Sequence, residues 1–149
     1  MNEDIETKLD REGLTLTPIK TRAYAYMIDD LLISMLIFIS FPSIFDGTLS
    51  NEAIISLIQS ILFEVMLIKI LYQTIFVTLY GATVGKIVMK IKIVEVSTLD
   101  KPRFVVALNR AVFRIISQLF YGLGFLWGFF NPEKQTLHDK TARTLVINA

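Results

Sequence analysis

Two long apolar runs dominate the chain, at about residues 23–45 and 53–80. About 20 apolar residues, rising roughly 1.5 Å each, cross a hydrocarbon core about 30 Å thick, so each run is long enough to span a membrane. Pro42 is expected to mark the far end of the first run, because proline interrupts helical hydrogen bonding. The turn-rich segment 41–51 then joins the runs. The pattern predicts two long transmembrane helices.

A third apolar region, at about residues 104–130, has a different pattern. A narrow polar stripe of Arg103, Arg110, Arg114 and Ser117 recurs at helical spacing through its first half. Such a stripe suits a helix at the membrane surface, or one that meets acids inside a bundle. Glycines weaken helix continuity in the second half. We expect an amphipathic helix followed by a short or re-entrant segment, with three full spans as the alternative.

Two short segments are predicted to be strands. Residues 87–96 are rich in β-branched side chains and partly alternate, and residues 144–147 are similar. The two are expected to pair as a small cytoplasmic β-element. Residues 1–20 mix acids and bases without an apolar block, and a polar, flexible cytoplasmic tail is expected there. The fold class is mainly α and membrane-bound, with one membrane domain over residues 21–147.

The composition supports a membrane protein and argues against several other classes. Of 149 residues, 53% are hydrophobic, and the mean hydropathy of +0.55 is high for a soluble domain. A net charge of +1 gives no bulk field to attract nucleic acid. With no cysteine and one histidine, which lies in a polar tail, the sequence supports neither a zinc site nor a hydrolase triad. We expect no enzyme, no cofactor and no bound metal.

The placement of lysine and arginine predicts the orientation. Basic residues flank the first run on its N-terminal side and follow the second run, whereas the 46–52 loop between the runs carries none. Because basic residues accumulate on the cytoplasmic side, the N-terminus is expected inside and this loop outside. The C-terminus follows Lys134, Lys140 and Arg143 and is expected inside too. These features predict a multi-pass protein of a bacterial cytoplasmic (inner) membrane.

Charged residues inside the apolar regions are the strongest functional signal. A charge in hydrocarbon is costly, so it is rarely accidental. Asp29 and Asp30 share one helix face with residue 22, and either acid is expected to meet Lys69 or the Arg110–Arg114 stripe. Carboxylates in a bundle can bind Na⁺ or relay protons, but ion pairs that fix helix register are the favoured interpretation. The charged-core candidates are Arg22, Asp29, Asp30, Glu64, Lys69, Arg110 and Arg114.

The segment Gly81-Ala-Thr-Val-Gly85-Lys86 has the outline of a phosphate-binding loop. Three residues rather than four separate its glycines, and Ile87 stands where serine or threonine holds magnesium. We interpret it as a tight glycine turn at the end of the second span, with Lys86 at the lipid headgroups. His138 and Asp139 are expected to form hydrogen bonds and charge pairs near the inner membrane surface.

These features in combination resemble the RDD family of small integral membrane proteins. The resemblance rests on Arg22 and Asp29, on the glycine turn, and on the segment Gln-Thr-Leu-His-Asp-Lys-Thr-Ala-Arg-Thr-Leu-Val at 135–146, and it covers about residues 20–147. The family is named for one arginine and two aspartates. They look like Arg22, Asp29 and, as our choice for the second aspartate, Asp139, with Asp30 competing. Gly81, Gly85, Lys86, His138 and Asp139 are the other positions that carry the resemblance.

Two positions depart from the family pattern. Arg143 stands where a glycine is usual, and Val84 stands where a proline is usual before Gly85. The local turns at these two places are therefore expected to differ from those of other members.

The resemblance implies a multi-span protein that is suspected of transporting a ligand. We accordingly expect transport of an ion, Na⁺ or H⁺, or of a small solute through the charged interior of the helix bundle. Because two spans enclose little space, the pathway requires a homo-oligomer or a membrane partner protein within the lipid bilayer. The competing expectation is a structural or assembly subunit that transports nothing. No nucleic-acid partner is expected.

Overall fold

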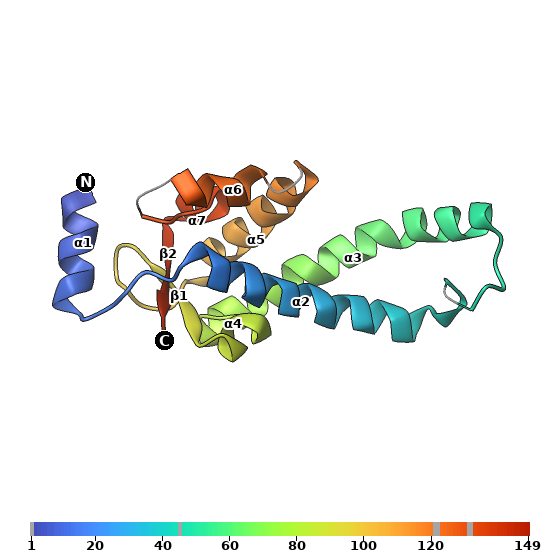
Figure 1. Ribbon diagram of the computed structural model, residues 1–149, viewed down its shortest axis with the longest axis horizontal. Helices are drawn as coiled ribbons and strands as arrows, with labels where there is room; N and C mark the ends of the chain where they lie inside the picture. Colours follow the sequence, from blue (N-terminus) through green and yellow to red (C-terminus); the bar gives the residue numbers. More distant parts are fainter. Residues whose placement is uncertain (1, 45, 121–122, 131–132) are drawn as a thin grey trace.

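Two long helices form a hairpin that extends from a smaller folded base in the computed structural model, which describes residues 2–44, 46–120, 123–130 and 133–149 (Figure 1). Helix α2 covers Ile19–Ser40 and α3 covers Asn51–Tyr80. Helix α2 both begins and ends about four residues earlier than expected. It stops before Phe41, which precedes Pro42, because a residue before proline is disfavoured in helical geometry. A 3₁₀ turn, Pro42–Ile44, follows.

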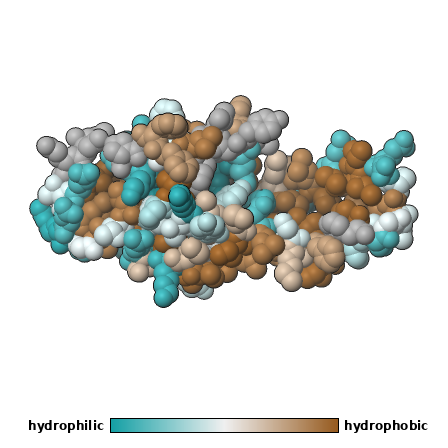
Figure 2. All heavy atoms as spheres, viewed as in Figure 1, coloured by the Kyte–Doolittle hydropathy of each residue, from teal (hydrophilic) through white to brown (hydrophobic). Residues whose placement is uncertain are grey.

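The hairpin exposes a continuous apolar surface. Both helices are long and apolar enough to cross a membrane. Large side chains such as Leu31 and Phe63 are more than 60% exposed. Figure 2 shows hydrophobic surface along the hairpin, with hydrophilic residues gathered at its tip and at the opposite end of the molecule. Because soluble proteins rarely expose apolar patches of this extent, the surface fits an apolar surrounding.

The segment after α3 turns sharply back toward α2. Gly81 ends α3 in the left-handed region at φ +69°, and its N–H donates to Val77 O at 2.9 Å. The short helix α4, Val84–Val88, follows and packs against α2. The expectation of a strand from residue 87 is therefore wrong at its start, because residues 87 and 88 close α4. Strand β1 begins later and covers Ile91–Glu95.

The predicted pairing of the two strands is confirmed. Strand β2, Thr144–Asn148, runs antiparallel to β1, with Ile93 opposite Val146. One face of this ribbon, which includes Ile93 and Val146, packs on Ala25 and Val77 of the long helices. The other face packs on the N-terminal helix through Leu9. The ribbon therefore connects the chain termini to the inner end of the hairpin.

Within the described residues, the N-terminal segment, for which a flexible tail was expected, forms a helix and a stretch that runs along β2. Helix α1 covers Asn2–Arg11. The chain then runs along β2, where Thr17 N donates to Val146 O and Asn148 N donates to Thr15 O, both at 3.0 Å. The composition did not reveal helix α1, because a mostly charged helix has few apolar positions that would indicate burial.

The third apolar region forms two helices rather than one. Helix α5 covers Phe104–Leu119 and packs along α3, and α6 covers Leu123–Phe130 and returns toward α7, Leu137–Thr141 (Figure 1). The 16 residues of α5 rise about 24 Å at roughly 1.5 Å each, less than a hydrocarbon core of about 30 Å. Within the described residues, α2 and α3 are the candidate spans. The amphipathic or re-entrant placement of residues 104–130 stays a prediction.

Candidate functional site

Asp139 is the centre of a buried ion cluster that joins three helices. Arg22 of α2 donates from Nη1 to Asp139 Oδ2 at 2.9 Å, and Nη1 of Arg110 on α5 contacts Oδ1 of the same carboxylate. All three side chains are at most 4% exposed. Because such pairs are weakly screened away from water, the cluster couples the first long helix to the C-terminal part of the chain. Arg22 also donates to Lys134 O at 2.7 Å.

A capping box presents Asp139 to the two arginines. Thr136 is the N-cap of α7, and its backbone N–H and its hydroxyl donate to Asp139 Oδ2 at 3.0 and 2.7 Å. This satisfies orphan donors at the helix N-terminus and fixes the carboxylate. The turn after α7 then passes through Arg143 at φ +50°, in the left-handed region that favours glycine.

The electrostatics of the cluster keep Asp139 ionised. Burial alone raises the pKa of Asp139, but the positive charges of Arg110 and Arg22 outweigh burial and hold that pKa well below its usual range. One carboxylate therefore faces two guanidinium groups. The cluster has an excess of positive charge, which matters for the cavity described below.

His138 is buried and neutral. Burial, together with the positive charge of Arg110, lowers the pKa of His138 well below its ordinary value. Its Nε2 lies 3.0 Å from Thr136 Oγ1. Because the single hydroxyl hydrogen of Thr136 goes to Asp139, Nε2 is the donor, and Nδ1 is an unprotonated acceptor without a partner among the described residues. The predicted hydrogen bonding of His138 is present, whereas the charge pairing belongs to Asp139 and the arginines.

Asp29 is held by neutral donors, which corrects the expectation that it meets a cation. Its carboxylate, on α2, accepts from Tyr72 Oη at 2.8 Å, from Thr83 Oγ1 at 2.6 Å and from Gly85 N at 2.8 Å. The residue is 3% exposed, and none of the described basic side chains forms an ion pair with it. The hydrogen-bond donors of Asp29 are thus two hydroxyls and one backbone N–H.

Gly85 makes this arrangement possible. A Cβ built at Gly85 would lie 2.0 Å from Ala25 O and 2.9 Å from Asp29 Oδ1. Only glycine therefore allows α4 to approach α2 closely enough for its backbone N–H to reach Asp29. The position singled out in the sequence as part of a glycine turn is a packing contact between two helices.

The other predicted charges fall in different surroundings. Asp30 accepts a 2.6 Å bond from Lys69 Nζ, so the expected contact between these two helices is present, although the two side chains are 44% and 24% exposed. Glu64 is exposed on α3. Its place in a charged core stays a prediction.

The polar stripe of α5 lies against acids and polar groups of the base, as the bundle interpretation of this helix expects. Arg103, at its start, pairs with Glu95 of β1 at 3.2 Å. Arg114 donates to Gln73 Oε1 at 3.1 Å and lies over the ring of Tyr26, 4.3 Å from its centroid. Arg114 has no ion-pair partner among the described residues, so only the first two arginines of the stripe meet acids.

Lys86 is buried, contrary to the expectation that it lies at the lipid headgroups. It is 5% exposed, and its Nζ lies 3.4 Å from Thr83 Oγ1. Burial, together with the charges of Arg114 and Arg110, lowers the pKa of Lys86 well below its usual range. The glycine turn was correctly expected at Gly81, but helix α4 directs the lysine inward instead of outward.

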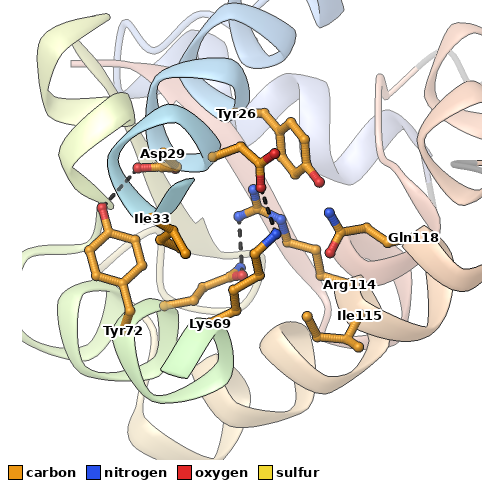
Figure 3. Close-up of a pocket in the computed structure, with 10 residues that line it drawn as sticks. Tyr26, Asp29, Ile33, Lys69, Tyr72, Arg114, Ile115 and Gln118 are labelled. Atoms are coloured by element: carbon orange, nitrogen blue, oxygen red, sulfur yellow. Dashed lines mark hydrogen bonds and ion pairs between the residues drawn. The ribbon is translucent and has the colours of Figure 1, made fainter. Parts of the chain in front are cut away.

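Two cavities adjoin these groups. A cavity of about 20 Å³, large enough for a water molecule, lies between α2, α3 and α5 beside Asp29, Asp30 and Lys69. Figure 3 shows Asp29 and Tyr72 joined on one side of it and Arg114 and Gln118 on the other. A second cavity of about 400 Å³ lies nearer the base and is lined by Arg22, Lys86, Arg110, Arg114, His138 and Asp139 together with apolar residues. Tyr26, Arg114 and Gln118 line both cavities.

Thr136, Tyr72 and Thr83 hold the two buried aspartates and were not predicted. Thr136 had a readable signal, because threonine three residues before Asp139 is a capping-box pattern. Tyr72 and Thr83 had none, since a single hydroxyl in an apolar helix or a turn is common. Their role depends on the docking of α4 against α2, which is a tertiary contact.

Comparison with known proteins places these residues in a family. A sequence model of the RDD family matches residues 16–143, most of the chain. An uncharacterized protein of Rickettsia prowazekii (strain Madrid E), RP437, is 32% identical over 69 residues, which cover 46% of this chain and 38% of that relative. The matched region thus spans well under half of the relative's length. Of the solved structures, none matches significantly.

Proposed function

The chain belongs to the RDD family, and we propose that it is an integral membrane protein that takes part in the transport of an ion or a small solute. Helices α2 and α3 span the bilayer, with the N-terminus, the sheet and the C-terminus in the cytoplasm and the loop at the hairpin tip outside. The protein is not an enzyme in this proposal. Its charged groups bind and pass on an ion or a small solute and break no covalent bond.

The observation that carries the proposal is the water-sized cavity beside the carboxylates. Asp30 and Lys69 lie at its wall with Asp29, and this cavity shares Tyr26 and Arg114 with the larger cavity of the base. Titratable groups that adjoin a chain of cavities are the usual elements of a proton or ion relay in a membrane. The two carboxylates suit H⁺ or Na⁺ at this point, because both ions prefer oxygen ligands of negative charge.

A flux assay with matched variants tests this proposal. The full chain is reconstituted in liposomes, and internal pH and Na⁺ are followed with fluorescent indicators under imposed gradients. Asp30→Asn removes an acid at the cavity wall, and Glu64→Gln removes one on the exposed face of α3. We expect wild-type flux to be lost in Asp30→Asn and kept in Glu64→Gln. Absence of any pH- or Na⁺-dependent flux in the wild type would contradict the proposal.

A second candidate function, that of an assembly subunit, is favoured by the position of Glu64. It lies near the middle of α3, about 20 Å from Asn51 and about 24 Å from Tyr80 at roughly 1.5 Å per residue. It is exposed there. An acid at this depth requires a partner, since a lone charge in hydrocarbon costs several kcal/mol. A second copy of the chain or another membrane protein supplies that partner in this reading.

Cysteine crosslinking separates the two candidates, because the chain has no cysteine of its own. Ser60→Cys places a thiol one helical turn from Glu64 on the exposed face. In native membranes, a disulfide-linked pair of identical chains supports the homo-oligomer that transport requires. A crosslink to a different protein, together with no flux in liposomes, supports the assembly subunit.

A further inference from the structure

The larger cavity has a charge imbalance that the transport proposal does not use. Four basic residues line it, namely Arg22, Lys86, Arg110 and Arg114, and Asp139 is the one acid among its described lining residues. Asp139 is already shared by Arg22 and Arg110. Lys86 and Arg114 have no carboxylate partner among the residues that the structure describes. The described lining of the cavity therefore has more basic groups than acidic ones.

Some residues that line this cavity also carry buried polar atoms without partners. Among the described residues, Arg22 Nε, Arg110 Nε and His138 Nδ1 are buried without a hydrogen-bond partner. The first two are N–H donors of side chains that are at most 4% exposed. A buried donor without an acceptor costs desolvation free energy, so such groups usually bind a ligand, an ion or water. Donors with positive charge select an acceptor with negative charge.

The shape of the cavity adds an apolar component. Its volume of about 400 Å³ lies in the range of small-ligand sites and far exceeds that of a bare ion. Arg22, Lys86, Arg110 and Asp139 are buried and Arg114 is half-buried, whereas Met27 and Leu126, which also line the cavity, are 62% and 49% exposed. The cavity thus has cations at its floor and apolar side chains at its rim. An oxyanion that carries an apolar chain satisfies both parts.

We propose that this cavity binds an oxyanion of the phosphate type, held by Lys86 and Arg114 beside the Arg22–Asp139–Arg110 cluster. The anion neutralises the cations that Asp139 leaves unpaired. The apolar rim suits the first carbons of a lipid chain, so the phosphate of an anionic membrane lipid and a free phosphate are the two sources of this chemistry. This anion site is independent of the transport proposal, because the anion would occupy the cavity whether or not anything crosses the membrane.

A ligand titration on the purified full chain in a zwitterionic detergent tests the site. The melting temperature is followed with three probes, a short-chain phosphatidic acid, phosphatidylcholine of the same chain length, and inorganic phosphate. We expect phosphatidic acid to raise the melting temperature saturably and phosphatidylcholine to leave it unchanged. If inorganic phosphate gives the same saturable rise, the anion site stands and a free ion is its source. If phosphatidic acid alone does so, the source is the lipid.

Three variants connect the binding to the cavity. Lys86→Met and Arg114→Gln each remove one cation of the floor, and Lys140→Met removes an exposed cation of α7 that does not line the cavity. Lys86→Met is expected to fold, because it replaces a buried amine that has no carboxylate partner among the described residues by an apolar chain. Each floor variant should weaken the apparent affinity for the anion about tenfold, the loss of one charge-assisted hydrogen bond, whereas Lys140→Met should leave it unchanged.

Two results would overturn the proposal. One is a melting temperature of the wild type that does not respond to phosphatidic acid or inorganic phosphate, or that responds equally to phosphatidylcholine. The other is an equal loss of affinity in Lys140→Met and in the floor variants, which would assign the effect to general surface charge. Arg114→Gln and Lys86→Met lie on different helices. If one variant fails to fold, the other still tests whether the cavity binds the anion.

Discussion

Asp139 and Asp29 are both buried aspartates at the base of the hairpin, yet their partners differ in kind. Asp139 lies between two guanidinium groups, from Arg22 and Arg110. Asp29 accepts hydrogen bonds from two hydroxyls and one backbone N–H, with no cation paired to it among the described residues. Two aspartates that are buried to a similar extent are thus held by different kinds of partner.

The difference shows which elements each aspartate connects. Asp139 is an electrostatic junction, because loss of its charge leaves two buried cations unpaired. Asp29 is a hydrogen-bond junction, since it ties α2 to the turn before α4 through donors that remain neutral. Substitutions that remove charge and substitutions that change shape should therefore affect the two sites unequally.

The largest expected effect is that of Asp139→Asn. The substitution leaves Arg22 and Arg110 without an anion, and breaking a buried pair in this way costs about 3–5 kcal/mol. We expect a strongly lowered melting temperature in detergent and poor recovery from membranes. Asp10→Asn, at an exposed acid of α1, is the matched control and should behave as wild type. Equal melting temperatures of the wild type and Asp139→Asn would show that the cluster is not an electrostatic junction.

Gly85→Ala should break the Asp29 site by shape alone. The added Cβ meets a backbone oxygen, which cannot move aside as a flexible side chain does, so α4 must shift and lose its bond to Asp29. A loss of about 3 kcal/mol in the free energy of unfolding is expected. Gly13→Ala is the control, because its Cβ meets nothing within 4 Å although φ is +64°. It should cost about 1 kcal/mol from conformation alone. Similar losses in both variants would remove the close-approach argument.

His138 gives a pH dependence to the base of the molecule. Its pKa is lower in the folded state than the ordinary 6.5, so the unfolded chain binds the proton more tightly. Stability is then fully present above about pH 6.5 and falls as the pH drops below it, by at most about 1.4 kcal/mol per pH unit. Asp139 does not contribute in this range, because its lowered pKa matters only in stronger acid.

Melting curves of the wild type and of His138→Gln between pH 7.5 and 5.5 measure this dependence. Glutamine keeps a donor toward Thr136 and cannot titrate, so the decline should be smaller in the variant by the share of His138, while the share that comes from the lowered pKa of Lys86 remains. An identical decline in both proteins would assign the pH dependence to other groups.

Arg143→Gly, in the turn after the helix that carries Asp139, should change the free energy of unfolding less than the preceding substitutions. Arg143 has φ +50°, and an L residue there costs about 1–2 kcal/mol that glycine avoids. Part of this gain is offset because glycine is more flexible in the unfolded chain. We expect stabilisation of about 1 kcal/mol and an upward shift in melting temperature. A lower melting temperature would mean that the exposed arginine has a contact role that outweighs its conformation.

The sequence predicted the elements whose signal is local and missed those that depend on packing. The two long helices follow from apolar runs, and the strand pair follows from β-branched residues near 91–95 and 144–148. The contact of Asp30 with Lys69 followed from equal depth on two neighbouring helices. Neutral partners for Asp29 were not predictable, because they require Gly85 to dock α4 against α2. Burial of Lys86 was missed for the same reason.

The most direct test of the two kinds of junction is a pair of double-mutant cycles with Arg110→Met. Asp139 contacts Arg110, whereas Asp29 shares no partner with it. The free energy of unfolding is measured for each single and double variant of Asp139→Asn and Asp29→Asn. We predict a coupling of about 2–3 kcal/mol between Asp139 and Arg110 and additivity within about 0.5 kcal/mol for Asp29 and Arg110. Equal coupling of both aspartates to Arg110 would contradict the account.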